Sequence, residues 1–278
     1  MAYHHLHIYR NTPYGRENLL HSIYFCKKLD LALHVYIPRM KKMLMYFRTG
    51  AVEVDLDSSY INHTDTAERN IETILADHNG TASFVTPSAY TGSNLPDIPT
   101  DFEFMACPRV ISDLSSKIGL GRIGSKVRDI LLHAPFPVFI PCQVFKKWRR
   151  IVVMFGGSAN GVKSMRIGIK AARIAGVPLD VVTIRENDNP ESHYQGVIKD
   201  RGLWPDLNEV MENWFFFNDG EFAENHFIIS HEALIVMGIS GHGKLKNIVF
   251  GSTAEMIQSI FPNSLVLVGP GCRQDHWH

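Results

Sequence analysis

The sequence is poor in the features that mark secreted, membrane-spanning or nucleic-acid-binding proteins. Its four cysteines, Cys26, Cys107, Cys142 and Cys272, show no paired spacing, so no disulfide framework is expected. No apolar run approaches the roughly 20 residues of a membrane span, and no signal region follows Met1. The 28 basic residues equal the 28 acidic ones, which disfavours non-specific binding to nucleic acid. We therefore expect a cytoplasmic protein that binds neither membrane nor nucleic acid.

What is present is a large hydrophobic fraction, arranged in short segments. Hydrophobic residues make up 45% of the 278, enough for a substantial core. Segments of strand length alternate with segments of helical periodicity, which predicts an α/β protein whose parallel sheet is covered on both faces. In the first half the expected strands are 6–9, 31–37, 81–86, 102–106 and 137–141, and the expected helices are 17–29 and a helix that begins with a capping box of Asp65 and Glu68 and stops near Gly80. In the second half the expected strands are 151–155, 179–184, 213–217, 233–237 and 265–268, and the expected helices are 161–175, 190–201, 221–230 and 252–261.

The chain also repeats itself. A shift of 127 residues places Gly124 on Gly251, Ser125 on Ser252 and Ile130 on Ile257, and a shift of 146 places Gly15 on Gly161 and Leu33 on Leu179. The difference between the two shifts makes the first copy 19 residues longer in its middle. The repeat predicts two copies of one supersecondary unit, over 1–147 and 148–278, with a basic connector at 146–150.

The most informative stretch is a glycine-rich loop in the second copy. Gly238, two residues, Gly241, nine residues and then Gly251-Ser252-Thr253 lie between an expected strand and an expected helix. Glycines let the backbone approach an anion closely, and the N–H groups at a helix start point toward it. The spacing differs from that of the P-loop and of the dinucleotide fingerprint. A ligand-free alternative is that Ser252 simply caps the helix.

This loop resembles that of the universal stress protein family, whose nucleotide-binding members carry Gly-x2-Gly-x9-Gly-Ser/Thr. The apolar strands 233–237 and 265–268 are similar to those of the family too, and the repeat identifies the chain as a tandem member. The resemblance implies two tandem doubly wound five-stranded parallel-sheet units of the adenine nucleotide α-hydrolase-like fold. Each ligand crevice should lie beyond the carboxyl ends of the strands, where the strand order reverses.

The resemblance also implies a site for ATP, or for AMP or ADP, in the second unit. Backbone and side chains of this site would come from Phe155, Gly156, Ile184, Met237, Gly238, Gly241, Gly243, Gly251, Ser252 and Thr253. In that arrangement Ile184 lies beside the base, with Phe155 close by. Met237 and Gly238 line the ribose and inner phosphate, and Gly251, Ser252 and Thr253 bind the outer phosphates.

Both copies depart from the family at one position. Nucleotide-binding members carry an Asp just after the first strand, where this sequence has Arg10 in the first copy and Gly156 in the second. The loss weakens the case for magnesium and costs about 1.5–3 kcal/mol of binding, although backbone amides could still hold the phosphates. The first copy also carries Ile111 and Leu114 in place of the first two loop glycines, so nucleotide is expected in the second copy only.

The preferred hypothesis is a stress-response sensor or regulator that binds ATP and is at most a slow ATPase, since no nucleophile and base are grouped in the sequence. One alternative is a nucleotide-free dimerisation or partner-binding stress protein. Another is an enzyme of the related ATP-using superfamily, which the missing acid disfavours. Because family members commonly associate through their last strands, 137–141 and 265–268 are expected to pair in an internal pseudo-dimer, and a homodimer of the whole chain is plausible.

Overall fold

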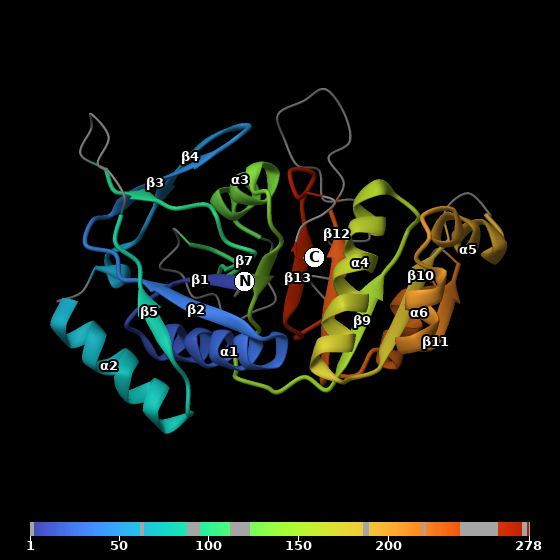
Figure 1. The fold of residues 1–278 in the computed structure, drawn as a ribbon, viewed down its shortest axis with the longest axis horizontal. Helices are drawn as coiled ribbons and strands as arrows, with labels where there is room; N and C mark the ends of the chain where they lie inside the picture. The colour runs from blue at the N-terminus through green and yellow to red at the C-terminus, as the bar shows by residue number, and fades with distance from the viewer. Residues whose placement is uncertain are drawn as a thin grey trace.

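The protein forms one long sheet with helices on both faces (Figure 1). The computed structural model describes residues 3–61, 64–87, 95–111, 123–185, 189–218, 221–239, 261–273 and 277. Within them the strand order of the ten-stranded sheet is β11-β10-β9-β12-β13-β8-β7-β1-β2-β5. The strands are β1 (Tyr3–Ile8), β2 (Leu31–Tyr36), β5 (Ala82–Phe84), β7 (Phe104–Ala106), β8 (Val138–Ile140), β9 (Arg150–Met154), β10 (Leu179–Ile184), β11 (Met211–Phe217), β12 (Ala233–Gly238) and β13 (Leu265–Val268). The helices are α1 (Pro13–Leu29), α2 (Thr64–Asp77), α3 (Ser125–His133), α4 (Ala159–Ala175), α5 (Glu191–Asp200), α6 (Trp204–Val210) and α7 (Glu221–Asn225).

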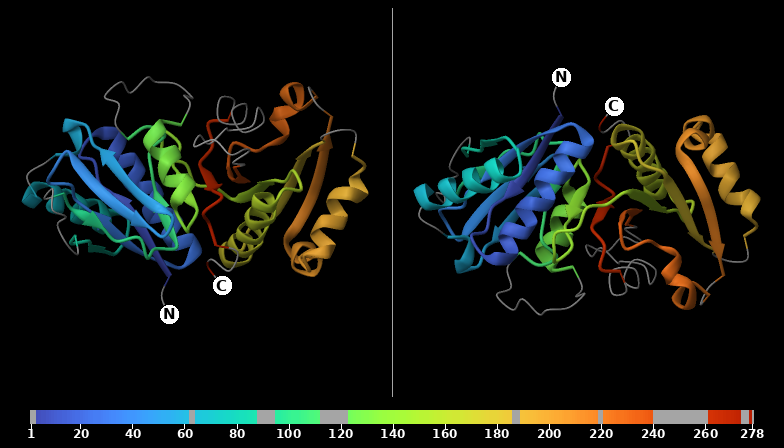
Figure 2. Two further views of the ribbon diagram at one scale, coloured as in Figure 1. Left: turned by 90° about the horizontal axis from the view of Figure 1, so that it is seen from above. Right: turned by 90° about the horizontal axis from the view of Figure 1, so that it is seen from below.

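The two halves of the sheet mirror one another. From the centre outward the first half runs β8-β7-β1-β2-β5 and the second half runs β13-β12-β9-β10-β11, which is the same connectivity twice. At the centre β13 pairs with β8 antiparallel, with Leu265 opposite Ile140 and Leu267 opposite Val138. Every other pair described in this sheet is parallel. Figure 2 shows the two halves on either side of β13, so the expected pairing of the last strands is confirmed.

Local sequence explains where the longest helices begin and end. Thr12 and Ser158 cap α1 and α4, because their hydroxyls accept a hydrogen bond from the amide of the residue three positions later, at 3.0 and 3.1 Å. Both helices end on a left-handed residue, Asp30 after α1 and Gly176 after α4. The equivalent caps support the expectation that the two helices occupy equivalent places.

Two hydrophobic clusters hold the layers together. One cluster joins α1, α2, α4, α5 and α6 to one face of the sheet. The other cluster covers the opposite face with α3, α7 and a second, three-stranded sheet of order β4-β3-β6. The second sheet consists of β3 (Lys42–Phe47), β4 (Gly50–Asp55) and β6 (Asp97–Ile98). Its β3–β4 hairpin inserts Met43, Met45 and Val54 into the core, each fully buried.

Several local expectations need correction. The hairpin occupies the additional middle of the first half and was not predicted, although β3 alternates buried and exposed residues as a half-buried strand should. The predicted capping box is wrong, because α2 already begins at Thr64 and Asp65 lies within its first turn. Helix α6 was not predicted, and the helix expected over 221–230 is the short α7 followed by the 3-10 turn η2 (His226–Ile228). The helix expected over 252–261 falls outside the described residues except for Phe261.

Two expectations about chemistry can be compared directly with the structure. All four cysteines are buried and unpaired. In the part of the chain that the structure describes, no helix is long and apolar enough to cross a membrane.

Candidate functional site

The candidate site lies where strand order reverses in the second half. Strand β9 has β10 on one side and β12 on the other, and the three strands run parallel. Their carboxyl ends therefore meet at one edge of the sheet, which brings together Phe155, Gly156, Ile184, Met237 and Gly238. This is the position at which open α/β sheets bind ligands.

The end of β12 is pressed against the start of α4. A Cβ on Gly238 would lie 2.5 Å from the carbonyl carbon of Asn160 and 2.8 Å from the amide nitrogen of Gly161, so only glycine fits. The Asn160 amide also donates to the carbonyl of Ile239 at 2.6 Å. Asn160 thus anchors the residue that leads into the glycine-rich loop. Sequence reasoning missed this anchor, because nothing local links position 160 to position 239.

The loop after β9 leaves open space. Gly156 is exposed, and a Cβ placed on it would meet no heavy atom of the described residues within 4 Å. Gly157 is the residue whose backbone requires glycine, with a φ of +76°. An acidic side chain at position 156 would therefore not clash with the described residues around it.

The apolar residues predicted for the site lie on opposite faces of the sheet. Phe155 is 1% exposed, and its ring packs edge-on against Trp214 at 6.0 Å between centroids. Its carbonyl accepts a hydrogen bond from the Thr183 hydroxyl at 2.8 Å. The Phe155 ring is thus directed into the core beneath α4 and does not line an open crevice. Met237 is buried in the cluster on the other face, and the partly exposed Ile184 packs against that cluster.

Among the described residues, Arg185 brings a positive charge to this edge of the sheet. Arg185 follows β10, and its Nη2 donates to Glu191 Oε1 of α5 at 2.8 Å. Its guanidinium carbon lies 5.7 Å from the centre of the Phe216 ring. Arg185 therefore places a positive charge at this edge of the sheet, where it forms an ion pair with the Glu191 carboxylate. The remaining predicted site residues, Gly241, Gly243, Gly251, Ser252 and Thr253, lie outside the described residues.

The corresponding edge of the first half is closed by an ion pair. Arg10 follows β1 and donates from Nη2 to Asp57 Oδ2 at 3.0 Å and from Nε to the Ser59 hydroxyl. Its guanidinium carbon also lies 5.1 Å from the centre of the Tyr60 ring. Burial raises the pKa of the Tyr60 hydroxyl, so that this group stays neutral. Asp57, Ser59 and Tyr60 come from the segment after the hairpin, which the second half lacks.

Two observations bear on which kind of ligand this edge could accept. Space beside Gly156 and a close-packed strand end at Gly238 would let a polyphosphate approach the backbone. Among the described residues no group of three His, Cys, Asp or Glu side chains could hold a metal ion.

Comparison with known proteins gives a consistent picture. No protein-family model matches the chain. The curated universal stress protein Slr1230 of a Synechocystis species is 23% identical over 172 residues, which are 59% of this chain and 56% of that protein. The chain thus aligns with about half the length of that curated relative. A universal stress protein structure from Archaeoglobus fulgidus covers 95% of this chain and 98% of its own, with a TM-score of 0.60 and 16% identity. A putative universal stress protein from Pseudomonas aeruginosa covers 96% and 93%, with a TM-score of 0.58 and 10% identity.

Proposed function

This chain has the fold of tandem universal stress proteins, and from that premise we propose that it is a stress-response regulator that binds an adenine nucleotide, ATP above all, in its second half. The proposal includes two units, 1–147 and 148–278, and a cytoplasmic location. ATP turnover, if there is any, is slow. The single observation that carries the proposal is the edge of the sheet at β9 and β12, where Gly156 leaves space and Gly238 lets the end of β12 pack closely against the start of α4.

The contrast between the two halves supports a single nucleotide site. In the first half Arg10 and Asp57 form a buried ion pair beyond β1, with side chains 11% and 5% exposed. At the family's loop positions the first half has Ile111, which is buried, and Leu114, which lies outside the described residues. A ligand at this edge would have to displace paired charges from a buried position, which is costly. Among the residues described in the second half, no such buried pair lies at Gly156.

Isothermal titration of the full chain with ATP, ADP and AMP tests the proposal. We expect one site per chain, lost in a Gly251→Val variant, because a β-branched side chain would crowd the backbone where the phosphates approach. The matched control is Gly196→Val on α5, where a Cβ meets no heavy atom within 4 Å. If the intact fold gives no heat with any of the three nucleotides, the nucleotide proposal fails.

Restoring the missing acid provides a second test. Gly156→Asp introduces a carboxylate into open space, so the fold should accept it. We expect the variant to bind ATP about tenfold or more tightly when magnesium is present, since a hydrogen bond or ion pair to a charged group contributes about 1.5–3 kcal/mol. An affinity that is unchanged with and without magnesium would contradict the placement of the nucleotide beside residue 156.

A nucleotide-free partner-binding role is the second candidate function. The observation that favours it is the absence of the expected acid in both halves, at Arg10 and at Gly156. The two candidates differ in the titration above, and phosphate release well above a protein-free control would instead indicate an ATP-using enzyme. Light scattering of the purified chain would show whether it also forms a homodimer.

A further inference from the structure

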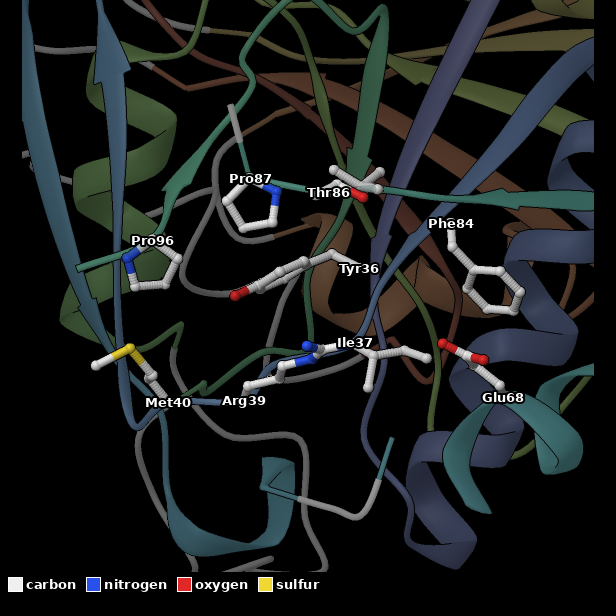
Figure 3. A pocket seen from close by; sticks show the side chains of 10 residues that line it. Tyr36, Ile37, Arg39, Met40, Glu68, Phe84, Thr86, Pro87 and Pro96 are labelled. Atoms are coloured by element: carbon white, nitrogen blue, oxygen red, sulfur yellow. The ribbon is translucent and has the colours of Figure 1, made fainter. Parts of the chain in front are cut away.

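A pocket opens in the first half at the carboxyl ends of β2 and β5, away from the candidate nucleotide site (Figure 3). Its cavity volume is about 150 Å³. The two strands are parallel neighbours, and they form the outer part of the sheet beyond β1. The residues that line the pocket are Tyr36, Ile37, Arg39, Met40, Glu68, Phe84, Val85, Thr86, Pro87 and Pro96. They come from the strand ends, from α2 and from the flanks of the second sheet.

Part of the lining is apolar and unusually exposed. Phe84 is 40% exposed and Met40 is 38% exposed, although both are large hydrophobic side chains. Pro87 and Pro96 complete the apolar wall near the buried Tyr36. An apolar cavity of about 150 Å³ is large enough for a benzene ring. The pocket therefore offers room for one apolar group of about that size.

The rest of the lining carries two opposite charges. Figure 3 shows the Arg39 side chain lying below Tyr36 and pointing toward the middle of the pocket, with the Glu68 carboxylate facing in from α2. Within the described ranges, neither Arg39 nor Glu68 makes an ion pair or a side-chain hydrogen bond. The two charges therefore converge on the same space without neutralising one another.

We infer that this pocket binds a free α-amino acid whose apolar side chain is about the size of a benzene ring. The carboxylate of the ligand would accept hydrogen bonds from Arg39, and its ammonium group would donate to Glu68. Both are charge-assisted hydrogen bonds, the stronger kind. The apolar side chain would lie against Phe84, which Figure 3 shows on the same side of the pocket as Glu68, and would cover its exposed surface. A simple anion or cation would satisfy only one of the two charges.

Isothermal titration of the full chain with phenylalanine and two analogues tests this inference. 3-Phenylpropanoate lacks the ammonium group, and phenethylamine lacks the carboxylate. We expect phenylalanine to bind at least tenfold more tightly than either analogue. Arg39→Gln should weaken phenylalanine about tenfold and leave phenethylamine unchanged, whereas Glu68→Gln should weaken phenylalanine and leave 3-phenylpropanoate unchanged.

Two matched variants control for general effects of charge. Arg48→Gln lies in the exposed turn between β3 and β4, and Glu72→Gln lies exposed on α2 one turn after Glu68. Both should leave phenylalanine binding unchanged. Absence of heat at millimolar phenylalanine with the fold intact would overturn the inference, as would equal losses in the control variants. Displacement of phenylalanine by ATP would also overturn it, because the pocket would then serve a nucleotide; the nucleotide proposal is tested separately through Gly251→Val.

Discussion

Lowering the pH from about 8 to about 5 is expected to destabilise the folded chain by about 4 kcal/mol or more, because three histidines are buried in the neutral form. His5 and His7 project from β1 toward α1 and share the Ser22 hydroxyl, at 3.3 Å from His5 Nε2 and 2.9 Å from His7 Nδ1. His21 on α1 contacts Cys142 Sγ through Nε2 at 3.3 Å. Each histidine is at most 2% exposed, and the second ring nitrogen of each has no hydrogen-bond partner among the residues that the structure describes.

The magnitude follows from the lowered pKa values. Burial lowers the pKa of His7 to about 3 and that of His21 to about 4 from an ordinary 6.5, and burial together with the neighbouring His7 lowers the pKa of His5. Since the unfolded chain binds these protons first, the stability is complete above about pH 6.5 and is lost as the pH falls toward the folded values. At about pH 5 one unfolded histidine with a pKa near 6.5 favours unfolding by about 2 kcal/mol. His7 and His21 together therefore contribute about 4 kcal/mol, and His5 adds to this in the same direction.

Urea unfolding followed by circular dichroism at several pH values measures this effect. His7→Asn keeps a group that can bond Ser22 but removes one titration, so the change in unfolding free energy between the two pH values should shrink by about 2 kcal/mol. His78→Asn, at an exposed position after α2, is the matched control and should leave the change as it is. An unaltered pH dependence in His7→Asn would refute the reasoning.

Two further substitutions test packing and charge. Gly238→Ala should destabilise the chain by about 1–3 kcal/mol in urea unfolding, because its Cβ would lie 2.5 Å from the Asn160 carbonyl carbon; a neutral result would contradict this close packing. Asp57→Asn should cost about 3 kcal/mol, since it leaves Arg10 buried without its carboxylate. Glu53→Gln, in an exposed ion pair, should cost less than about 1 kcal/mol, and equal losses in the two charge variants would count against the buried pair.

The sequence alone determined most of the fold, because the signals involved are local or repeated. Apolar runs of strand length placed β9, β10, β12 and β13 to within one or two residues. The internal repeat and the resemblance together predicted the pairing of β13 with β8, which the structure confirms. The edge of the second half at which we propose that the nucleotide binds was also predicted, because the carboxyl ends of neighbouring parallel strands must meet. Its glycine-rich loop lies outside the described residues and stays a prediction.

Only the tertiary structure decided which side chains face a ligand and which face the core. Ile184 was predicted beside the base with Phe155 close by, and the structure shows that the Phe155 ring packs under α4, because a residue just past a strand end can be directed to either face. Arg10 finds Asp57, which is 47 residues away in sequence, and no local pattern encodes such a partner. The alternation of apolar and polar residues along β4 could have revealed the β3–β4 hairpin. The face of the main sheet that the hairpin covers could not have been predicted from that pattern. Periodicity reports burial along one element, whereas the pairing of distant side chains depends on how the elements pack.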